Sequence, residues 1–118
     1  MSLYPKWEPN KWNKNILIRK SHNCYLYAMD EIDINYINKC NNTCERPQPG
    51  MRKGKMDILD SAFTIKKLIR YIKLEYPSFK RWSINKKKPK NYYRIALFIE
   101  NNHTDYHFYR QDNDGLWS

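Results

Sequence analysis

The sequence predicts a single α+β domain, in which N-terminal helices pack on a small C-terminal antiparallel sheet. Three observations lead to this prediction. The chain has 118 residues and 41% of them are hydrophobic, which is enough for one domain with a modest core. Apolar residues follow helical spacing through most of residues 16–76. Two aromatic-rich runs typical of strands follow within residues 91–118, so helices and strands are segregated along the chain.

The first fifteen residues are predicted to form an extended arm anchored by aromatic side chains. Two prolines interrupt this segment, and we expect both of its tryptophans to pack over the domain. These residues are Pro5, Pro9, Trp7 and Trp12. The apolar run 16–18 that follows predicts either a strand or a buried lead-in to the first helix.

A helix is predicted to begin at Cys24, because the three residues before it supply N-cap chemistry. Its apolar positions suit a helix buried on one broad face: Tyr25, Leu26, Ala28, Met29 and Ile32. Residues 34–37 are expected to add a helical turn. Residues 38–54 are polar and predict a loop, with a tight turn at Gln48, Pro49 and Gly50.

The most regular helical pattern starts near Asp60, with Asp60 or Ser61 as the expected cap, and Pro77 ends it. Its predicted apolar stripe is Phe63, Ile65, Leu68, Ile69, Ile72 and Leu74. A basic connector covers residues 77–90. Residues 92–99 and 106–111 predict strands, and residues 113–115 predict a hairpin turn. Since the chain then stops at Ser118, we expect a short stub of return strand, or a chain shorter than its relatives.

Net charge makes polyanions plausible partners for this chain. Lys and Arg number 22 against 12 Asp and Glu, which gives +10. Nucleic acid or an acidic protein would suit this balance. The same bias also arises from A/T-rich codons, which encode Lys, Asn, Ile and Tyr. With only 3 Gly and no phosphate-binding fingerprint, we expect no bound cofactor, and the oligomeric state stays open.

Cysteine usage and hydropathy predict an intracellular protein, cytoplasmic or nuclear. The three cysteines are an odd number, and no apolar leader opens the chain. No apolar run reaches membrane-spanning length, so we expect no membrane association. Free thiols are the expected state in a reducing compartment.

Cys24 and His107 together suggest nucleophilic chemistry. The thiolate is the reactive form of cysteine, and a helix N-terminus or a nearby imidazole lowers the thiol pKa. His107 lies in the second predicted strand, and Asp105 shares its strand face, so Asp105 could orient the ring. The alternatives are a buried structural Cys24 and a half-buried His107 bonded to backbone.

Residues 23–28 (NCYLYA) and 106–109 (YHFY) resemble the cysteine-bearing helix start and the histidine strand of papain-like cysteine hydrolases. The compact NlpC/P60 and CHAP amidase–peptidase branches are the most similar. The resemblance implies a compact papain-like domain that cleaves an amide or isopeptide bond in a peptide or amide substrate. It also implies that Cys24 is the nucleophile and His107 the base. The family places a third polar residue on a later strand, which is almost absent here, so the predicted site is active or degenerate.

Two further patterns suggest other functions. Cys40 and Cys44 have the spacing of half a zinc site, but no second cysteine pair completes it, so no metal is expected. Basic residues lie next to Trp82 and the pair Tyr92 and Tyr93, an arrangement that suits single-stranded nucleic acid. The candidate binding residues are Lys86, Lys87, Lys88, Lys90 and Trp82, with Lys80 and Arg81 nearby.

The lysine run also resembles a nuclear import signal. The alternative interpretation is that these lysines lie in a solvated loop without a binding function. The leading prediction from sequence is a cysteine hydrolase. The alternative is a basic non-enzymatic protein that binds nucleic acid or serves in an assembly.

Overall fold

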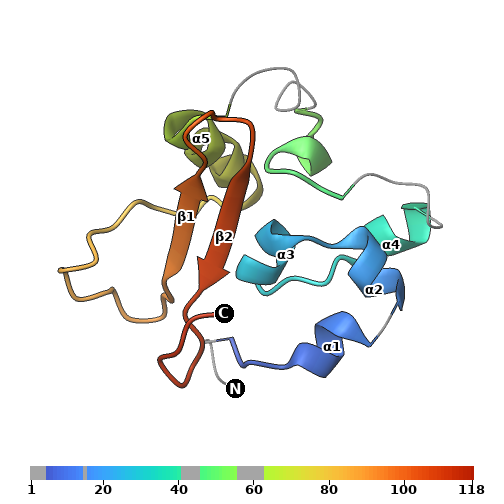
Figure 1. Ribbon diagram of the computed structural model, residues 1–118, viewed down its shortest axis with the longest axis horizontal. Helices are drawn as coiled ribbons and strands as arrows, with labels where there is room; N and C mark the ends of the chain where they lie inside the picture. The colour runs from blue at the N-terminus through green and yellow to red at the C-terminus, as the bar shows by residue number, and fades with distance from the viewer. Residues whose placement is uncertain (1–4, 15, 41–45, 56–62) are drawn as a thin grey trace.

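The computed structural model describes residues 5–14, 16–40, 46–55 and 63–118 (Figure 1). Helices come first along the chain and strands last, which confirms the predicted α+β class. The elements are α1 (Pro9–Asn13), α2 (Ile16–Ser21), α3 (Cys24–Ala28), α4 (Ile34–Cys40), the 3-10 turn η1 (Met51–Lys53), α5 (Ile65–Glu75), β1 (Ile95–Ile99) and β2 (Tyr106–Arg110).

In the described part of the chain, the sheet consists of β1 and β2, which pair antiparallel. Ile95 lies opposite Arg110, and Ile99 lies opposite Tyr106. The predicted turn at residues 113–115 is confirmed, with Gly115 at a φ of 85°. The return strand is a stub, because Ser118 and Arg110 exchange two backbone hydrogen bonds of 2.9 Å and Gln111 bridges to Trp117.

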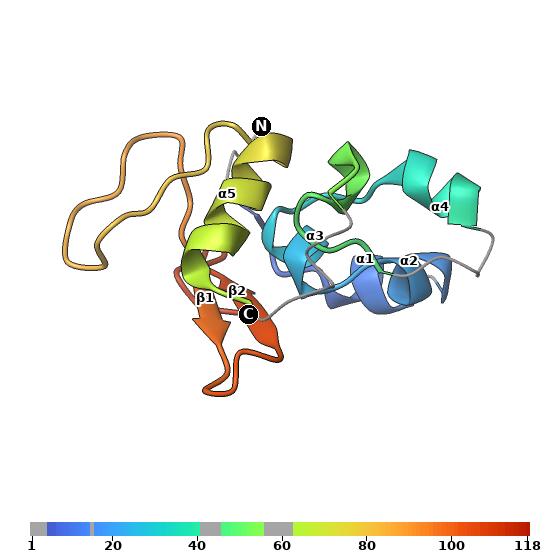
Figure 2. The same ribbon diagram turned by 90° about the horizontal axis from the view of Figure 1, so that it is seen from above.

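The core forms where α3 and α5 meet the sheet. One face of the sheet is turned toward α5, and α3 lies beside β2 (Figures 1 and 2). Tyr106 and Phe108 of β2 are buried, while the alternate residues His107 and Tyr109 are exposed. The other buried members of this core are Tyr25, Leu26 and Ala28 from α3 and Leu68, Tyr71 and Ile72 from α5.

Helix α3 begins where the sequence predicts, and Asn23 is its cap. The Asn23 side chain accepts a hydrogen bond from the Leu26 N–H at 3.2 Å, and its Nδ2 donates to the Pro47 carbonyl at 2.7 Å. The cap therefore also joins α3 to the loop before η1. A helix of five residues is too short to persist alone, so these contacts and its buried face must hold it.

The structure corrects the predictions for the N-terminal third. Residues expected to form an extended arm include helix α1, and the run 16–18 belongs to helix α2 rather than to a strand. Trp12 is buried as expected, but Trp7 is 64% exposed. Pro9 at the first helical position has a φ already suited to a helix, which explains how this proline-containing segment becomes helical.

Helix α5 also begins later than predicted. Thr64 is its N-cap, with its side chain accepting from the Lys67 N–H at 3.1 Å. The prediction that Asp60 or Ser61 caps this helix is wrong, and both residues lie outside the described ranges. Leu74 is exposed, whereas Tyr71 is buried against the core.

Helices in the described ranges are all too short or too polar to cross a lipid bilayer.

Candidate functional sites

Cys24 is the first residue of α3, and its thiol lies against the outer edge of β2. Helix α3 packs beside β2, and the Cys24 side chain packs against the core cluster that includes Tyr106 and Phe108. In this antiparallel ladder, hydrogen-bonded pairs alternate with pairs that exchange no hydrogen bonds. Glu100 and Asp105 form a hydrogen-bonded pair, and so do Phe98 and His107 two positions along. Phe108 belongs to a pair of the other kind, so its N–H points away from β1. The fold thus brings the predicted nucleophile to the strand that carries His107.

The pKa of the Cys24 thiol is raised, mainly because burial disfavours the thiolate. The backbone N–H groups of Phe108, Cys24 and Tyr25 lower the pKa of the thiol by a smaller amount. The carboxylate of Asp105 raises the pKa further by charge repulsion. At neutral pH, Cys24 therefore rests as a thiol rather than as a preformed thiolate.

His107 and Asp105 do not surround the thiol as a catalytic triad in this structure. The His107 ring is exposed, on the sheet face opposite to Tyr106 and Phe108, and packs edge-on to Tyr109 at 4.6 Å between ring centroids. Asp105 Oδ1 accepts a hydrogen bond from the Tyr106 N–H at 2.8 Å. Within the described ranges, no hydrogen bond joins Asp105 to His107, so the expected orienting contact is not made.

Tyr106 is a site residue that the sequence analysis did not identify. Its side chain is only 7% exposed, and its hydroxyl has no hydrogen-bond partner in the described part of the chain. Burial raises its pKa, with smaller contributions from the charges of Cys24 and Asp105. A buried hydroxyl without a partner is uncommon, and this one interacts electrostatically with the thiol. No local pattern in the sequence separates this tyrosine from the nine others.

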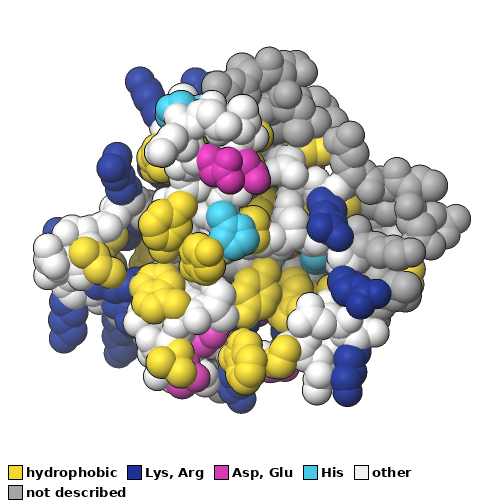
Figure 3. Space-filling model, viewed as in Figure 1, with side chains coloured by type: hydrophobic (Ala, Val, Ile, Leu, Met, Phe, Trp, Pro, Cys, Tyr) yellow, Lys and Arg dark blue, Asp and Glu magenta, His cyan; other side chains and the backbone are white. Residues whose placement is uncertain are grey.

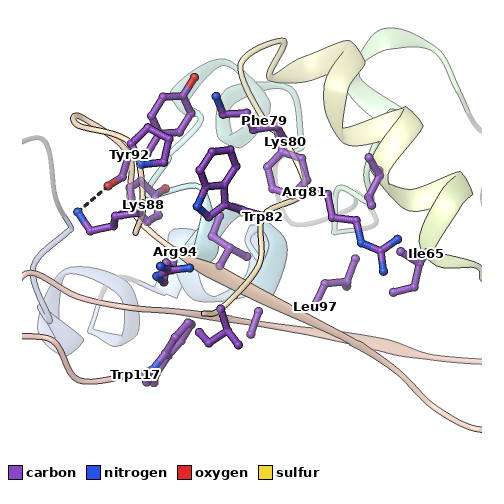
Figure 4. Close-up of a pocket in the computed structure, with 16 residues that line it drawn as sticks. Ile65, Phe79, Lys80, Arg81, Trp82, Lys88, Tyr92, Arg94, Leu97 and Trp117 are labelled. Atoms are coloured by element: carbon purple, nitrogen blue, oxygen red, sulfur yellow. Dashed lines mark hydrogen bonds between the residues drawn. The ribbon is translucent and has the colours of Figure 1, made fainter. Parts of the chain in front are cut away.

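A second candidate site is a cavity of about 370 Å³ between α5, β1 and the loop 77–94, which we call the basic groove. Ile65 and Ile69 of α5 and Leu97 of β1 provide an apolar floor. Its other walls carry aromatic and basic side chains from the loop: Phe79, Lys80, Arg81, Trp82, Lys88 and Tyr92 (Figure 4).

The predicted nucleic-acid residues divide into two groups. Trp82 and Lys88 line the groove, and the Lys86 Nζ lies 4.3 Å from the centre of the Trp82 ring. Lys87 and Lys90 are exposed and are not part of the lining. Lys87 contributes its backbone instead, because its carbonyl accepts from Trp82 Nε1 at 3.1 Å.

Among the described residues, no group of three or more His, Cys, Asp or Glu side chains is arranged to hold a metal ion. The Cys40 side chain and residues 41–45, which include Cys44, lie outside the described set.

Comparisons with protein-family models, with curated proteins and with solved structures gave no match. The functional assignment therefore depends on the geometry of the two sites.

Proposed function

We propose that this protein is a papain-like cysteine hydrolase that cleaves amide or isopeptide bonds, with Cys24 as nucleophile and His107 as general base. The observation that carries the proposal is that α3, which begins with Cys24, packs beside β2, the strand that carries His107. The fold thus brings Cys24 beside the strand of a residue 83 positions away in the chain, although the His107 ring itself lies on the exposed face of that strand.

The proposal requires the His107 side chain to turn from the exposed face toward the strand edge beside Cys24. Its ring is exposed and contacts the exposed Tyr109, so a change of rotamer costs no buried contact. Catalytic hydrogen bonds are often long or misaligned in free enzymes and tighten when substrate binds. Because Cys24 rests as a thiol, the proposal requires His107 to remove its proton as the sulfur attacks.

The reaction follows from these positions. His107 takes the thiol proton while Cys24 Sγ bonds to the substrate carbonyl carbon, and the backbone N–H groups at the start of α3 stabilise the oxyanion. His107 then gives this proton to the leaving amine, which leaves a thioester on Cys24. Water attacks the thioester with His107 again as base, and its proton regenerates the thiol as the carboxylate product departs.

The test uses p-nitrophenyl acetate as a simple acyl donor. We expect acetylation of Cys24, located by mass spectrometry, with release of nitrophenol, and no such product in Cys24→Ala. His107→Ala should slow acetylation of Cys24 by about 100-fold or more, the usual contribution of a general base. His103→Ala, which removes another exposed histidine, should keep the wild-type rate.

Circular dichroism of each variant would show that the fold is kept. Acetylation of Cys40 or Cys44 in preference to Cys24 would contradict the proposal. So would an unchanged rate of Cys24 acetylation in His107→Ala.

A further inference from the structure

We propose that the basic groove binds single-stranded nucleic acid, with an unpaired base in the cavity and the backbone phosphates on its basic rim. This inference is independent of the proposed hydrolase. The groove is lined by Ile95, Ala96 and Leu97 of β1, whereas Cys24 begins α3, which packs beside β2. The two sites therefore lie at opposite edges of the same pair of strands.

Charge identifies the class of ligand. Between Glu75 and Glu100 the sequence contains no acidic residue, but it contains seven basic ones: Lys80, Arg81, Lys86, Lys87, Lys88, Lys90 and Arg94. The ion pairs found in the described ranges involve Lys11, Arg52 and Arg110, all outside this segment. The chain thus supplies no acidic side chain from within the loop to neutralise it, which favours a polyanion.

Hydrogen bonds hold the loop 77–94 in a defined conformation, so it is more than a solvated run of basic residues. The guanidinium of Arg94 donates to the carbonyls of Ser83 and Lys86, at 3.2 and 2.5 Å. Trp82 Nε1 donates to the Lys87 carbonyl, which closes the loop on itself. These bonds hold Trp82 over the groove before any ligand arrives, so little ordering is required on binding.

Aromatic rings and ammonium groups alternate along the wall of the groove. The Lys80 Nζ lies 4.7 Å from the Tyr92 ring centre and 5.2 Å from the Trp82 ring centre. Lys86 covers Trp82 at 4.3 Å. A base that stacks on Trp82 would displace Lys86 from the ring, and the freed ammonium group would then pair with the adjacent phosphate. Interleaved rings and cations of this kind serve single strands, because every base has a face on which a ring can stack.

The shape of the groove favours a single strand over a duplex. The cavity of about 370 Å³ is recessed between α5 and the loop, and Ile65 and Leu97 form part of its apolar floor (Figure 4). Ile69 of α5 also lines it. A duplex presents its phosphates outside and keeps its bases stacked inside, so it could use the rim but not the floor. Only an unpaired base can fill the apolar part.

The test measures binding of a short fluorescein-labelled thymidine strand to the whole chain by anisotropy, at about 50 and about 200 mM salt. We expect Trp82→Ala to weaken binding about tenfold or more, and Trp82→Phe to retain most of the affinity. Trp7→Ala, which removes an exposed tryptophan outside the groove, should have no effect. A matched duplex, phosphatidylserine vesicles and polyglutamate should each compete poorly with the single strand.

Two variants that each remove one positive charge distinguish binding in the groove from general electrostatic attraction. Arg81→Gln, at the rim, should lower the slope of log affinity against log salt by about 0.7, the value for one phosphate contact on a single strand. Lys73→Gln removes one charge from the exposed side of α5 and should leave the slope unchanged. Equal effects of the two charge variants would overturn the proposal. So would unaltered binding in Trp82→Ala, or equal competition by duplex, vesicles or polyglutamate.

Discussion

Two arginines, Arg52 and Arg110, join segments that are far apart in the chain. Arg52 pairs with Asp33 at 2.8 Å and with Glu75 at 2.9 Å, so it links α5 to the segment before α4. Arg110 is fully buried, and its guanidinium lies 3.9 Å from the centre of the Tyr27 ring. A buried guanidinium is costly to leave unpaired, and Arg110 donates from Nε, Nη1 and Nη2, which makes this side chain sensitive to substitution.

Arg110→Ala is expected to lower the free energy of unfolding by about 3–5 kcal/mol, the usual cost of leaving a buried charge unpaired. The lost partners are Asp112 at 2.8 Å, Asp30 at 3.0 Å, and the carbonyls of Tyr27 and Lys6 at 2.9 and 2.7 Å. Urea denaturation followed by tryptophan fluorescence measures the loss. Arg110→Lys keeps the charge without the forked geometry and should lose less. A loss below about 1 kcal/mol in Arg110→Ala would contradict this prediction, because exposed surface salt bridges contribute that little.

His22 is expected to make stability depend on pH in the mildly acidic range. Burial lowers its pKa below the ordinary 6.5, although Asp33 and Glu31 act to raise it and Arg52 lowers it further. Its Nε2 accepts a hydrogen bond from the Asp33 N–H at 2.9 Å, which a protonated ring cannot do. The unfolded chain thus binds a proton more readily, so the unfolding free energy should fall as pH drops below 6.5.

The measurement for His22 is urea unfolding between pH 7.5 and 5.5. His22→Gln keeps an acceptor that does not titrate, so its stability should vary less with pH over this interval. His103→Gln changes an exposed histidine and should keep the wild-type dependence. Asp33 does not confuse the comparison, because Arg52 and the Tyr36 N–H outweigh burial and hold its pKa below 3.8. An identical pH dependence in His22→Gln and the wild type would refute this role.

At the scale of elements, the close approach of η1 to α5 depends on Gly50. Its φ is +84°, and an added Cβ would lie 3.1 Å from the Cβ atoms of Lys55 and Tyr71. Gly50→Ala should therefore lose about 1–3 kcal/mol of unfolding free energy through strain and crowding together. Gly54→Ala is the matched control: φ is +83° but the space is open, so only the backbone strain of about 1 kcal/mol remains. Equal losses in thermal or urea unfolding would show that crowding by Tyr71 is unimportant.

Elements with local signals could be predicted from the sequence, and those fixed by distant contacts could not. The α3 cap, the turn at Pro49 and Gly50, and the hairpin turn before Leu116 all have residues suited to their backbone conformation. Helix α1 has five residues, and Trp12 holds it by packing edge-on to Tyr27 at 5.2 Å. The residues around Trp12 in the sequence do not predict that contact, because Tyr27 lies outside the helix.

The candidate thiol site shows the same limit. Helix-start chemistry identifies Cys24, and strand alternation identifies the face on which His107 lies. Neither pattern says that the sulfur lies at the edge of β2 while the ring lies on its exposed face. Tyr106 packs edge-on to Phe63 at 4.8 Å between ring centroids, and its hydroxyl has no partner among the described residues; only the folded chain can show either feature.

At the scale of the whole molecule, the surface divides into regions of different character. On the face seen in Figure 3, hydrophobic side chains gather over β1, β2 and the C-terminal turn. Large hydrophobic residues that are exposed in these elements are Phe98 of β1, Tyr109 of β2, and Leu116 and Trp117 after the turn at residues 113–115. The loop 77–94 projects away from β1 (Figure 2). Its sequence contains seven basic residues and no acidic one. Binding and hydrolysis would thus be served by separate edges of one small sheet.

This separation predicts that the two proposed activities are independent. Changes at sites that share no partners usually add, within a factor of about two in rate or affinity. Trp82→Ala should therefore leave the rate of Cys24 acetylation within about twofold of the wild type, and Cys24→Ala should leave oligonucleotide affinity within the same range. Saturating single strand should likewise leave acetylation unchanged. A tenfold change in either direction would mean that the strand crosses the sheet face between β1 and β2 and reaches the thiol, which would make the groove part of the substrate site.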